Sequence, residues 1–284
     1  MEKPDPTWSY GVVLELVCTL ANVAGKQCFR LAALRSNGWY HVLGVVVLFC
    51  LYMPLNSVAL SLAPNSIVSA VDGMIVVWNI LLAPLTLGEA ITRSRLAAAA
   101  LITVGTAVAA LLGNHTDRDH NHEQYLHDLR QPRALVYYEI TGMTILFLFC
   151  AARAQLEKSQ RRSGALFALL GGLLAGNAGL YWKAALQFVV ESLWDAPWVY
   201  VLAATNFLMA GSGIACLAYA MRRNAALYVL PFYEALVILS AGVGGYALYR
   251  EYEDNTPGRI AGYWLSRAWH SRHLWPHRCA HACA

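Results

Sequence analysis

Long apolar stretches separated by short charged segments constrain the fold of this chain more than any other feature. Hydrophobic residues make up 58% of its 284 residues and charged residues only 13%, whereas a typical soluble domain carries about 25% charged residues. A helix that crosses a bilayer needs about 20 apolar residues, and most of the chain consists of stretches of that length. This composition excludes an ordinary water-soluble globule and a disordered chain.

The apolar stretches are predicted to be helices, because they are long and lack the period-two alternation of a half-buried strand. The predicted spans are Tyr10–Leu34, Trp39–Ser61, Ser66–Leu87, Ser94–Gly113, Ala134–Arg153, Gly164–Val190, Pro197–Met221 and Ala225–Tyr249. A ninth apolar stretch begins near Arg259 and fails after Leu265. The predicted fold class is an all-α membrane protein, a polytopic bundle of eight or nine transmembrane helices.

Basic residues set the expected orientation in the membrane. The loops that follow spans 1, 3, 5 and 7 hold ten Lys and Arg residues, while the other side holds six, together with eleven of the seventeen acidic residues. The positive-inside rule therefore places the N-terminus outside and the first loop in the cytoplasm. We expect a plasma-membrane or endosomal protein whose partner is the lipid bilayer, with a homo-oligomer as one form of assembly. No basic face with interleaved aromatic residues is present, so nucleic acid is not an expected partner.

The two halves of the chain resemble each other. Asp72 in span 3 and Glu234 in span 8 are each followed by a glutamate seventeen residues later. A pattern of Asn, Gly and Lys links Asn22 in span 1 to Asn177 in span 6. Both matches have an offset of five spans, and copies offset by an odd number of spans lie upside down relative to each other. This pattern predicts the inverted-topology internal repeat of many secondary transporters, whose substrate site lies near the midplane between the copies.

The repeat divides the chain into five predicted segments. They are residues 1–113 as the first transmembrane repeat, 114–133 as a His- and acid-rich extracytoplasmic loop, 134–163 as a connector helix with a basic cytoplasmic loop, 164–265 as the second repeat, and 266–284 as an atypical C-terminal tail.

Short motifs in both halves resemble a known family. The run Ala63-Pro64-Asn65-Ser66-Ile67-Val68-Ser69, which leads into span 3, and the ending Leu87-Gly88-Glu89 resemble the drug/metabolite transporter superfamily. The run from Asn224 to Tyr233, with Pro231 and an aromatic pair, resembles the NIPA-type magnesium transporter branch. The resemblance covers residues 13–261. It implies helical spans only, no cofactor, and transport of a divalent cation, with magnesium as the best-known substrate.

Charged residues within the spans are the first candidates for a site. They are Glu15, Lys26, Asp72, Glu139, Lys183 and Glu234. Each costs about 2.5–3.5 kcal/mol at a helix centre, so all six are expected to face the bundle interior.

Magnesium takes oxygen ligands, keeps several waters and is commonly held by one or two carboxylates. The predicted substrate-binding residues are Asp72, Glu234, Asn22, Asn79, Asn177 and Tyr233, with Asp72 and Glu234 as the metal ligands. A second interpretation makes Asp72 and Glu234 structural ion-pair partners of Lys26 and Lys183. The two lysines would also suit an anionic metabolite.

Two polar segments outside the spans carry further candidate ligands. The outer loop holds four histidines among acidic residues, which suits either a cation-gathering antechamber or a solvated polar loop. Asn114 opens a glycosylation sequon close to span 4. In the tail, His277, Cys279, His281 and Cys283 alternate with other residues. This pattern fits either soft metal ligands or a sequence that replaces an expected last span.

Three classes of function remain open at this stage. The first is a divalent-cation transporter, most favourably for magnesium. The second is a drug/metabolite-type carrier for a small polar or anionic metabolite, and the third is a non-transporting membrane scaffold. An enzyme is not expected, because the chain has neither a His-Glu-x-x-His zinc motif nor a Gly-x-Ser-x-Gly elbow.

Overall fold

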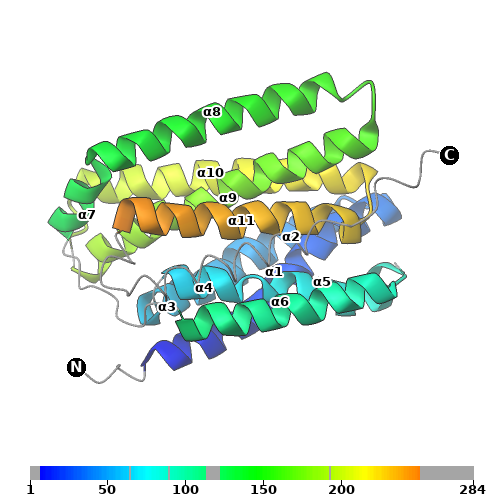
Figure 1. Cartoon of the computed structure of the whole chain (residues 1–284), viewed down its shortest axis with the longest axis horizontal. Coiled ribbons are helices and arrows are strands. Elements are labelled where there is room, and N and C mark those ends of the chain that lie inside the picture. The colour runs from blue at the N-terminus through cyan, green and yellow to red at the C-terminus, as the bar shows by residue number, and fades with distance from the viewer. Residues whose placement is uncertain (1–6, 64, 89, 113–121, 192, 250–284) are drawn as a thin grey trace.

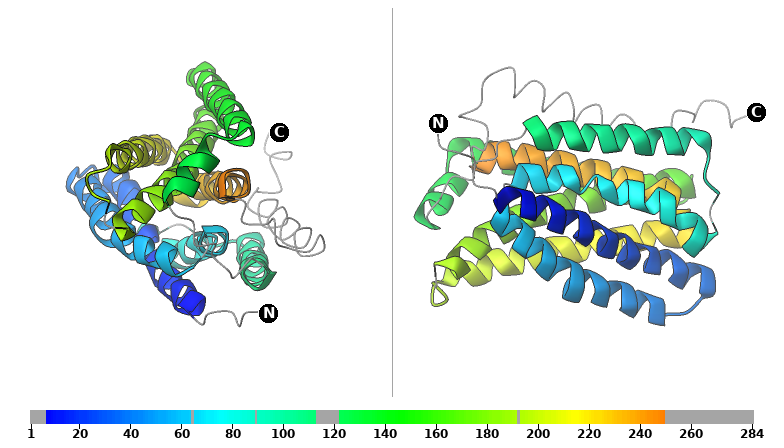
Figure 2. Two further views of the ribbon diagram at one scale, coloured as in Figure 1. Left: turned by 90° about the vertical axis from the view of Figure 1, so that its left-hand side faces the viewer. Right: turned by 90° about the horizontal axis from the view of Figure 1, so that it is seen from below.

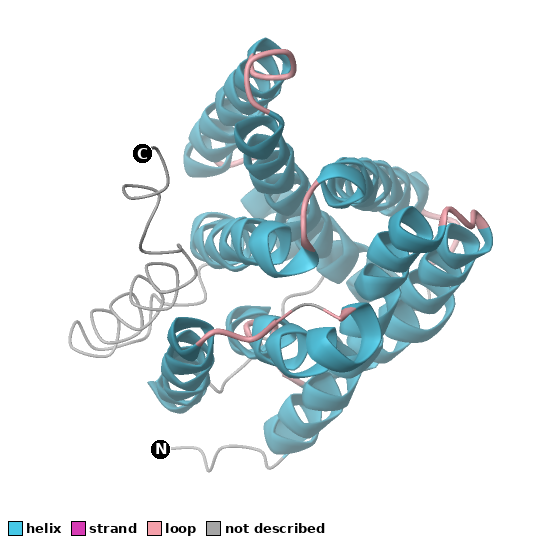
Figure 3. Cartoon of the chain, turned by 90° about the vertical axis from the view of Figure 1, so that its right-hand side faces the viewer, coloured by secondary structure: helices cyan, strands magenta, loops and turns pink. Residues whose placement is uncertain are grey.

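The computed structural model describes residues 7–63, 65–88, 90–112, 122–191 and 193–249. Within these ranges all regular secondary structure is helical, as Figure 3 shows. Several predictions concern residues outside the described ranges. They are the ninth span, the tail 266–284 with its His and Cys residues, the sequon at Asn114, and the two glutamates, Glu89 and Glu251, that mark the repeat.

Among the described residues, six helical segments are long and apolar enough to cross a membrane. They are Trp8–Arg35, Trp39–Leu62, Pro132–Ala154, Gln160–Val190, Pro197–Arg223 and Ala226–Leu248. They correspond to α1 (Thr7–Arg35), the run of α2 (Trp39–Val46), η1 (Val47–Tyr52) and α3 (Met53–Leu62), and then α8 (Pro132–Ala154), α9 (Gln160–Val190), α10 (Pro197–Arg223) and α11 (Ala226–Tyr249). The prediction of an integral, multi-pass, all-helical protein is therefore confirmed for this part of the chain.

The predicted third span is a broken helix rather than a continuous one. It consists of α4 (Asn65–Val71) and α5 (Met74–Leu87), and the break falls at Asp72 and Gly73. At the break, the N–H of Gly73 bonds the carbonyl of Ala70 at 3.1 Å, three residues back instead of four. Glycine destabilises a helix interior by about 1 kcal/mol, so the chain turns more tightly at this point. The break brings the backbone and side chain of Asp72 to the bundle interior.

The second span contains a wider turn. Between α2 and α3, residues Val47–Tyr52 form the π-helix η1, just before Pro54. A proline has no N–H to donate, and its ring clashes with the carbonyl four residues earlier in a regular α-helix. The π turn widens the helix at this position and so accommodates the proline. Such turns occur frequently at functional sites.

The predicted fourth span and the outer loop are also helical where they are described. Helix α6 (Arg93–Leu112) packs against α4 and α5, and α5 ends at Gly88, whose φ of +66° is left-handed. The described part of the loop forms a short helix, α7 (His122–Leu129), that contacts α8, α9 and α11.

The helices form one bundle with α9 and α11 near its centre and α8 at its edge (Figures 1 and 2). Helices α4 and α5 lie along α11 and run in the opposite direction, as Figure 1 shows. Opposite directions for these two spans are what an inverted repeat requires. The repeat itself stays a prediction.

Glycines allow α9 to approach α11 closely. A side chain on Gly172 would overlap the backbone carbonyl of Tyr233, and one on Gly176 would overlap the backbone of Val237. Small residues are enriched at such membrane helix interfaces because they let backbones pack directly. The contact fixes the position of the α11 turn that carries Tyr233 and the next residue, Glu234.

Five of the six charged residues within the predicted spans are buried, as expected, whereas Glu139 is exposed on α8. Glu139 lies only two helical turns from Pro132, so its carboxylate is close to the membrane surface, where a charge costs less than at the centre. The predicted inward position of Glu139 is therefore wrong. On the same helix, the hydroxyl of Tyr137 is buried and donates to the Asn177 side chain at 2.7 Å.

Candidate functional site

A cavity of about 140 Å³ lies inside the bundle, between α1, the second span, the α4–α5 break, α9, α10 and α11. Its walls extend from the middle of these helices toward the end of the bundle at which α1 begins. One water molecule needs about 10–15 Å³ of such space, so the cavity has room for several waters or for a small hydrated ligand. Both irregular segments, η1 and the α4–α5 break, contribute to its walls.

A buried ion pair forms part of the wall. The Nζ of Lys26 on α1 donates to Oε1 of Glu234 on α11 at 2.6 Å, and both side chains are at least 95% buried. The same Nζ lies 4.7 Å from the ring centre of Tyr233, in a cation–π arrangement. The structural ion-pair interpretation is therefore correct for Glu234 and Lys26, while the same carboxylate still lines the cavity.

Two further buried acidic residues, Glu15 and Asp72, lie closer to the end of the bundle at which α1 begins. Glu15 on α1 is fully buried, and its Oε2 accepts a hydrogen bond from Nδ2 of Asn56 at 2.9 Å. The carboxyl group of Asp72, at the helix break, lies close enough to the Glu15 carboxyl for the two to interact electrostatically. Among the described residues, neither of these two carboxyl groups has a salt-bridge partner. The second interpretation, in which Asp72 also forms an ion pair, is thus not realised there.

Three buried oxygen atoms of cavity-lining side chains have no hydrogen-bond partner among the described residues. They are Oδ1 of Asn22, Oδ1 of Asp72 and Oε2 of Glu234. Only one cavity-lining nitrogen, Nδ2 of Asn206, is in the same situation. Buried polar atoms are almost always paired, and an unpaired one costs about 1–3 kcal/mol. The described walls of the cavity therefore have more unpaired hydrogen-bond acceptors than unpaired donors.

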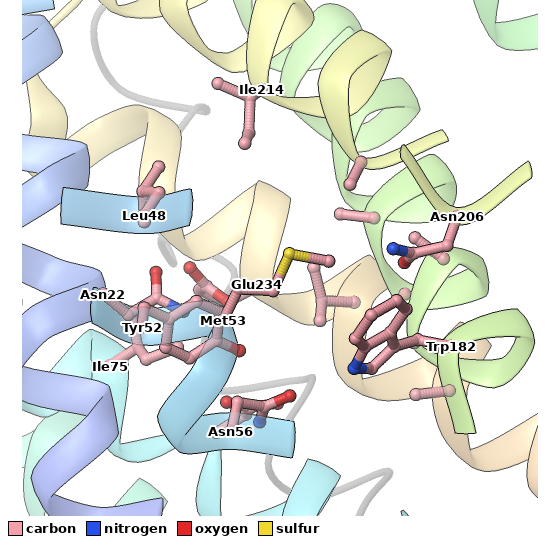
Figure 4. A pocket seen from close by; sticks show the side chains of 18 of the residues that line it. Asn22, Leu48, Tyr52, Met53, Asn56, Ile75, Trp182, Asn206, Ile214 and Glu234 are labelled. Carbon is pink, nitrogen blue, oxygen red and sulfur yellow. The ribbon is translucent and has the colours of Figure 1, made fainter. Parts of the chain in front are cut away.

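The opposite walls of the cavity differ in character. Figure 4 shows Asn22, Tyr52 and Glu234 on one side and Trp182 with Asn206 across the gap. The indole N–H of Trp182 is already used, because it donates to the hydroxyl of Ser57 at 2.6 Å. The site is thus an oxygen-rich wall that faces a largely apolar, aromatic one.

Of the six predicted substrate-binding residues, four line the cavity: Asn22, Asp72, Tyr233 and Glu234. The other two are buried elsewhere and already bonded. Oδ1 of Asn79 accepts from Nε2 of Gln27 at 3.0 Å, and the Asn177 side chain bonds Tyr137 and the carbonyl of Leu173.

Sequence reasoning missed several residues of the site. Asn56 and Asn206 are amides within predicted spans, so the criterion that selected the other asparagines could have selected them as well. Tyr52 and Trp182 carry no such signal, because aromatic residues also occupy lipid-facing and interfacial positions. Glu15 was expected to face the bundle interior but was not among the predicted site residues, and the structure buries it completely.

The described residues contain no cluster of three or more His, Cys, Asp or Glu side chains with metal-site geometry. A metal ion in this cavity would therefore depend on two carboxylates, on amide oxygens and on water. Comparison of the chain with protein-family models, with curated proteins and with solved structures finds no match.

Proposed function

We propose that this protein is a membrane carrier for a divalent cation, with magnesium as the favoured substrate. The observation that carries the proposal is the set of three unpartnered oxygens, on Asn22, Asp72 and Glu234, that line one buried cavity. Oxygen atoms without hydrogen-bond donors are ready ligands for a hard cation. The resemblance of the sequence to NIPA-type magnesium transporters favours the same substrate.

The chemistry of magnesium fits this arrangement. Magnesium keeps several of its waters and is usually bound through one or two carboxylates, and the cavity has room for both ion and waters. Among the cavity-lining residues, the two carboxyl groups of Asp72 and Glu234 outnumber the single ammonium of Lys26. This excess of acidic groups favours a cation over an anion.

The inverted repeat, which we keep as part of this proposal, would let the cavity open alternately to each side. In the described state, polar contacts close the bundle beyond Lys26. Thr86 donates to Gln27 at 2.7 Å, Gln27 donates to Asn79, and Arg30 donates to the carbonyl of Met221 at 3.0 Å. With the orientation predicted from the basic loops, this closed end faces the cytoplasm and the cavity belongs to the outer half.

A second candidate function has an observation of its own. Lys26 lies in the cavity wall, and the aromatic side chains of Trp182, Tyr52 and Phe49 line the same space. An ammonium group and aromatic faces suit a small organic molecule better than a hydrated metal ion. A small polar or anionic metabolite is therefore the alternative substrate. The scaffold interpretation is less favoured, because a scaffold function does not require a buried cavity lined by unpaired oxygens.

Replacing Asp72 with Asn should lower magnesium uptake at least tenfold. The change removes one negative charge and one ligand oxygen, while the amide keeps the size of the side chain. Uptake would be measured with the purified chain in lipid vesicles that contain a magnesium-sensitive dye. The matched control is Glu139→Gln, which removes a carboxylate from the exposed face of α8, away from the cavity.

Three outcomes of this experiment are informative. Loss of uptake in Asp72→Asn with normal uptake in the control supports the cation site. Wild-type uptake in Asp72→Asn contradicts it. If vesicles with the wild-type chain or with either variant take up no magnesium but do take up a small organic acid, the result favours the metabolite as the alternative substrate.

A further inference from the structure

Three exposed arginines gather at the end of the bundle at which α1 and α10 end and α9 and α11 begin (Figure 1). Arg161 lies in the first turn of α9, and Arg222 and Arg223 are the last two residues of α10. The two helix ends are in contact, because the ring centres of Phe167 on α9 and Tyr219 on α10 lie 4.8 Å apart. We call Arg161, Arg222 and Arg223 the basic surface.

Aromatic rings hold two of the guanidinium groups of the basic surface in place. The guanidinium of Arg161 lies 4.6 Å from the ring centre of Tyr228 on α11, and that of Arg223 lies 5.0 Å from the ring centre of Tyr219. Among the described residues, none of the three arginines of the basic surface forms a salt bridge. The face of a ring attracts a cation without neutralising its charge. The positive charge of the basic surface therefore stays available to an anion.

The segments around the basic surface supply little negative charge. The first turn of α9 holds Arg161 and Arg162 and no acidic residue, although acidic residues are favoured at this end of a helix. Glu157, which precedes α9, is exposed and forms no salt bridge within the described part of the chain. Nη2 of Arg222 lies 3.4 Å from Nε2 of His41, so the start of α2 joins the same surface with a neutral or basic side chain.

The position of the basic surface indicates which anion it binds. Helices α9, α10 and α11 are long and apolar enough to cross a membrane, and the ends of such helices lie at the level of the lipid headgroups. Guanidinium groups bind phosphate oxygens through paired hydrogen bonds. The orientation predicted from the basic loops places this end in the cytoplasm, and the cytoplasmic leaflet is the one that carries anionic lipids. The phosphate of a lipid therefore matches the surface in both charge and depth.

We propose that the basic surface of Arg161, Arg222 and Arg223 binds the phosphate group of an anionic phospholipid. The rings of Tyr228 and Tyr219 order two of the guanidinium groups before the lipid arrives, so less side-chain freedom is lost on binding. A lipid bound there bridges the start of α9 and the end of α10. The inference is independent of the proposed cation transport, because no residue of the basic surface lines the cavity.

Native mass spectrometry of the full chain in detergent, titrated with phosphatidylglycerol or with phosphatidylcholine, tests the proposal directly. The wild-type chain should bind the anionic lipid roughly tenfold more tightly than the zwitterionic one. Arg161→Gln and Arg223→Gln should each lower the affinity for phosphatidylglycerol about fivefold, which corresponds to about 1 kcal/mol for one arginine at an anionic membrane surface. Both side chains are exposed, so circular dichroism should show unchanged helix content.

Arg130→Gln is the matched control. Arg130 also lies over an aromatic ring, 5.6 Å from the ring centre of Trp198, but at the opposite end of the bundle, where α10 begins. This variant should bind phosphatidylglycerol as tightly as the wild-type chain. Equal binding of the two lipids by the wild-type chain, or the same loss in Arg130→Gln as in the other variants, would overturn the proposal. Displacement of the bound lipid by inorganic phosphate would also overturn it, because the ligand would then be a soluble phosphate.

Discussion

Replacing Glu234 with Gln should lower the free energy of unfolding by about 3–5 kcal/mol, because the change leaves the ammonium of Lys26 buried without its counter-ion. The Lys26–Glu234 contact is 2.6 Å long, and neither side chain is more than 5% exposed. An uncompensated charge at this depth is poorly solvated, because the side chain is almost entirely buried. Unfolding of the purified chain by heat or denaturant in detergent would measure the loss.

The pair offers its own control. Lys26→Met combined with Glu234→Gln removes both charges, so much of the lost stability should return in the double variant. Asp72→Asn provides a second comparison, because Asp72 has no salt bridge among the described residues. We expect its stability to change little while its transport activity falls. A Glu234→Gln variant as stable as the wild-type chain would show that Lys26 and Glu234 are not a buried ion pair.

The helical, multi-span character of the fold could be predicted because it follows from local properties. Apolar stretches of bilayer length have to satisfy their own backbone hydrogen bonds, and helices do so within one segment. The inward position of Glu15, Lys26 and Asp72 was predictable for a similar reason, since a charge exposed to lipid is costly. Glu139 departs from this rule, because it lies close enough to the helix end for that cost to fall.

The pairing within the site could not be predicted from the sequence. Glu234 had two chemically equivalent candidate partners, Lys26 and Lys183, and only the tertiary arrangement that brings side chains of α1 and α11 together selects the one 208 residues away. Asn79 and Asn177 were equally good candidate ligands until the structure placed Gln27 and Tyr137 beside them. Such contacts depend on how helices distant in sequence are rotated against each other.

The irregular segments within the spans were harder to predict from the sequence than the spans themselves. Gly73 and Pro54 were visible, but a glycine or proline within a membrane helix is often tolerated without a break, because neighbouring groups satisfy the freed backbone. Here the chain breaks at Asp72-Gly73 and widens before Pro54, and both irregularities line the cavity. Discontinuous helices commonly form the binding sites of transporters, so a glycine or a proline next to polar residues within a span is a signal that points toward the site.

Replacing Gly172 with Ala should destabilise the protein by about 1–3 kcal/mol, although alanine is the better helix former. The new methyl group would overlap the backbone carbonyl oxygen of Tyr233, so α9 and α11 have to move apart. Because Glu234 follows Tyr233 directly, the same movement should stretch its contact with Lys26 and reduce transport.

Gly211→Ala is the matched control, because Gly211 lies within α10 and has open space where the methyl group would sit. This control should stabilise the chain by up to about 1 kcal/mol through helix propensity alone. The two substitutions add the same methyl group to a membrane helix, so only the surroundings of the glycine differ. Equal effects of the two changes on thermal unfolding would mean that α9 and α11 are not in direct backbone contact at Gly172.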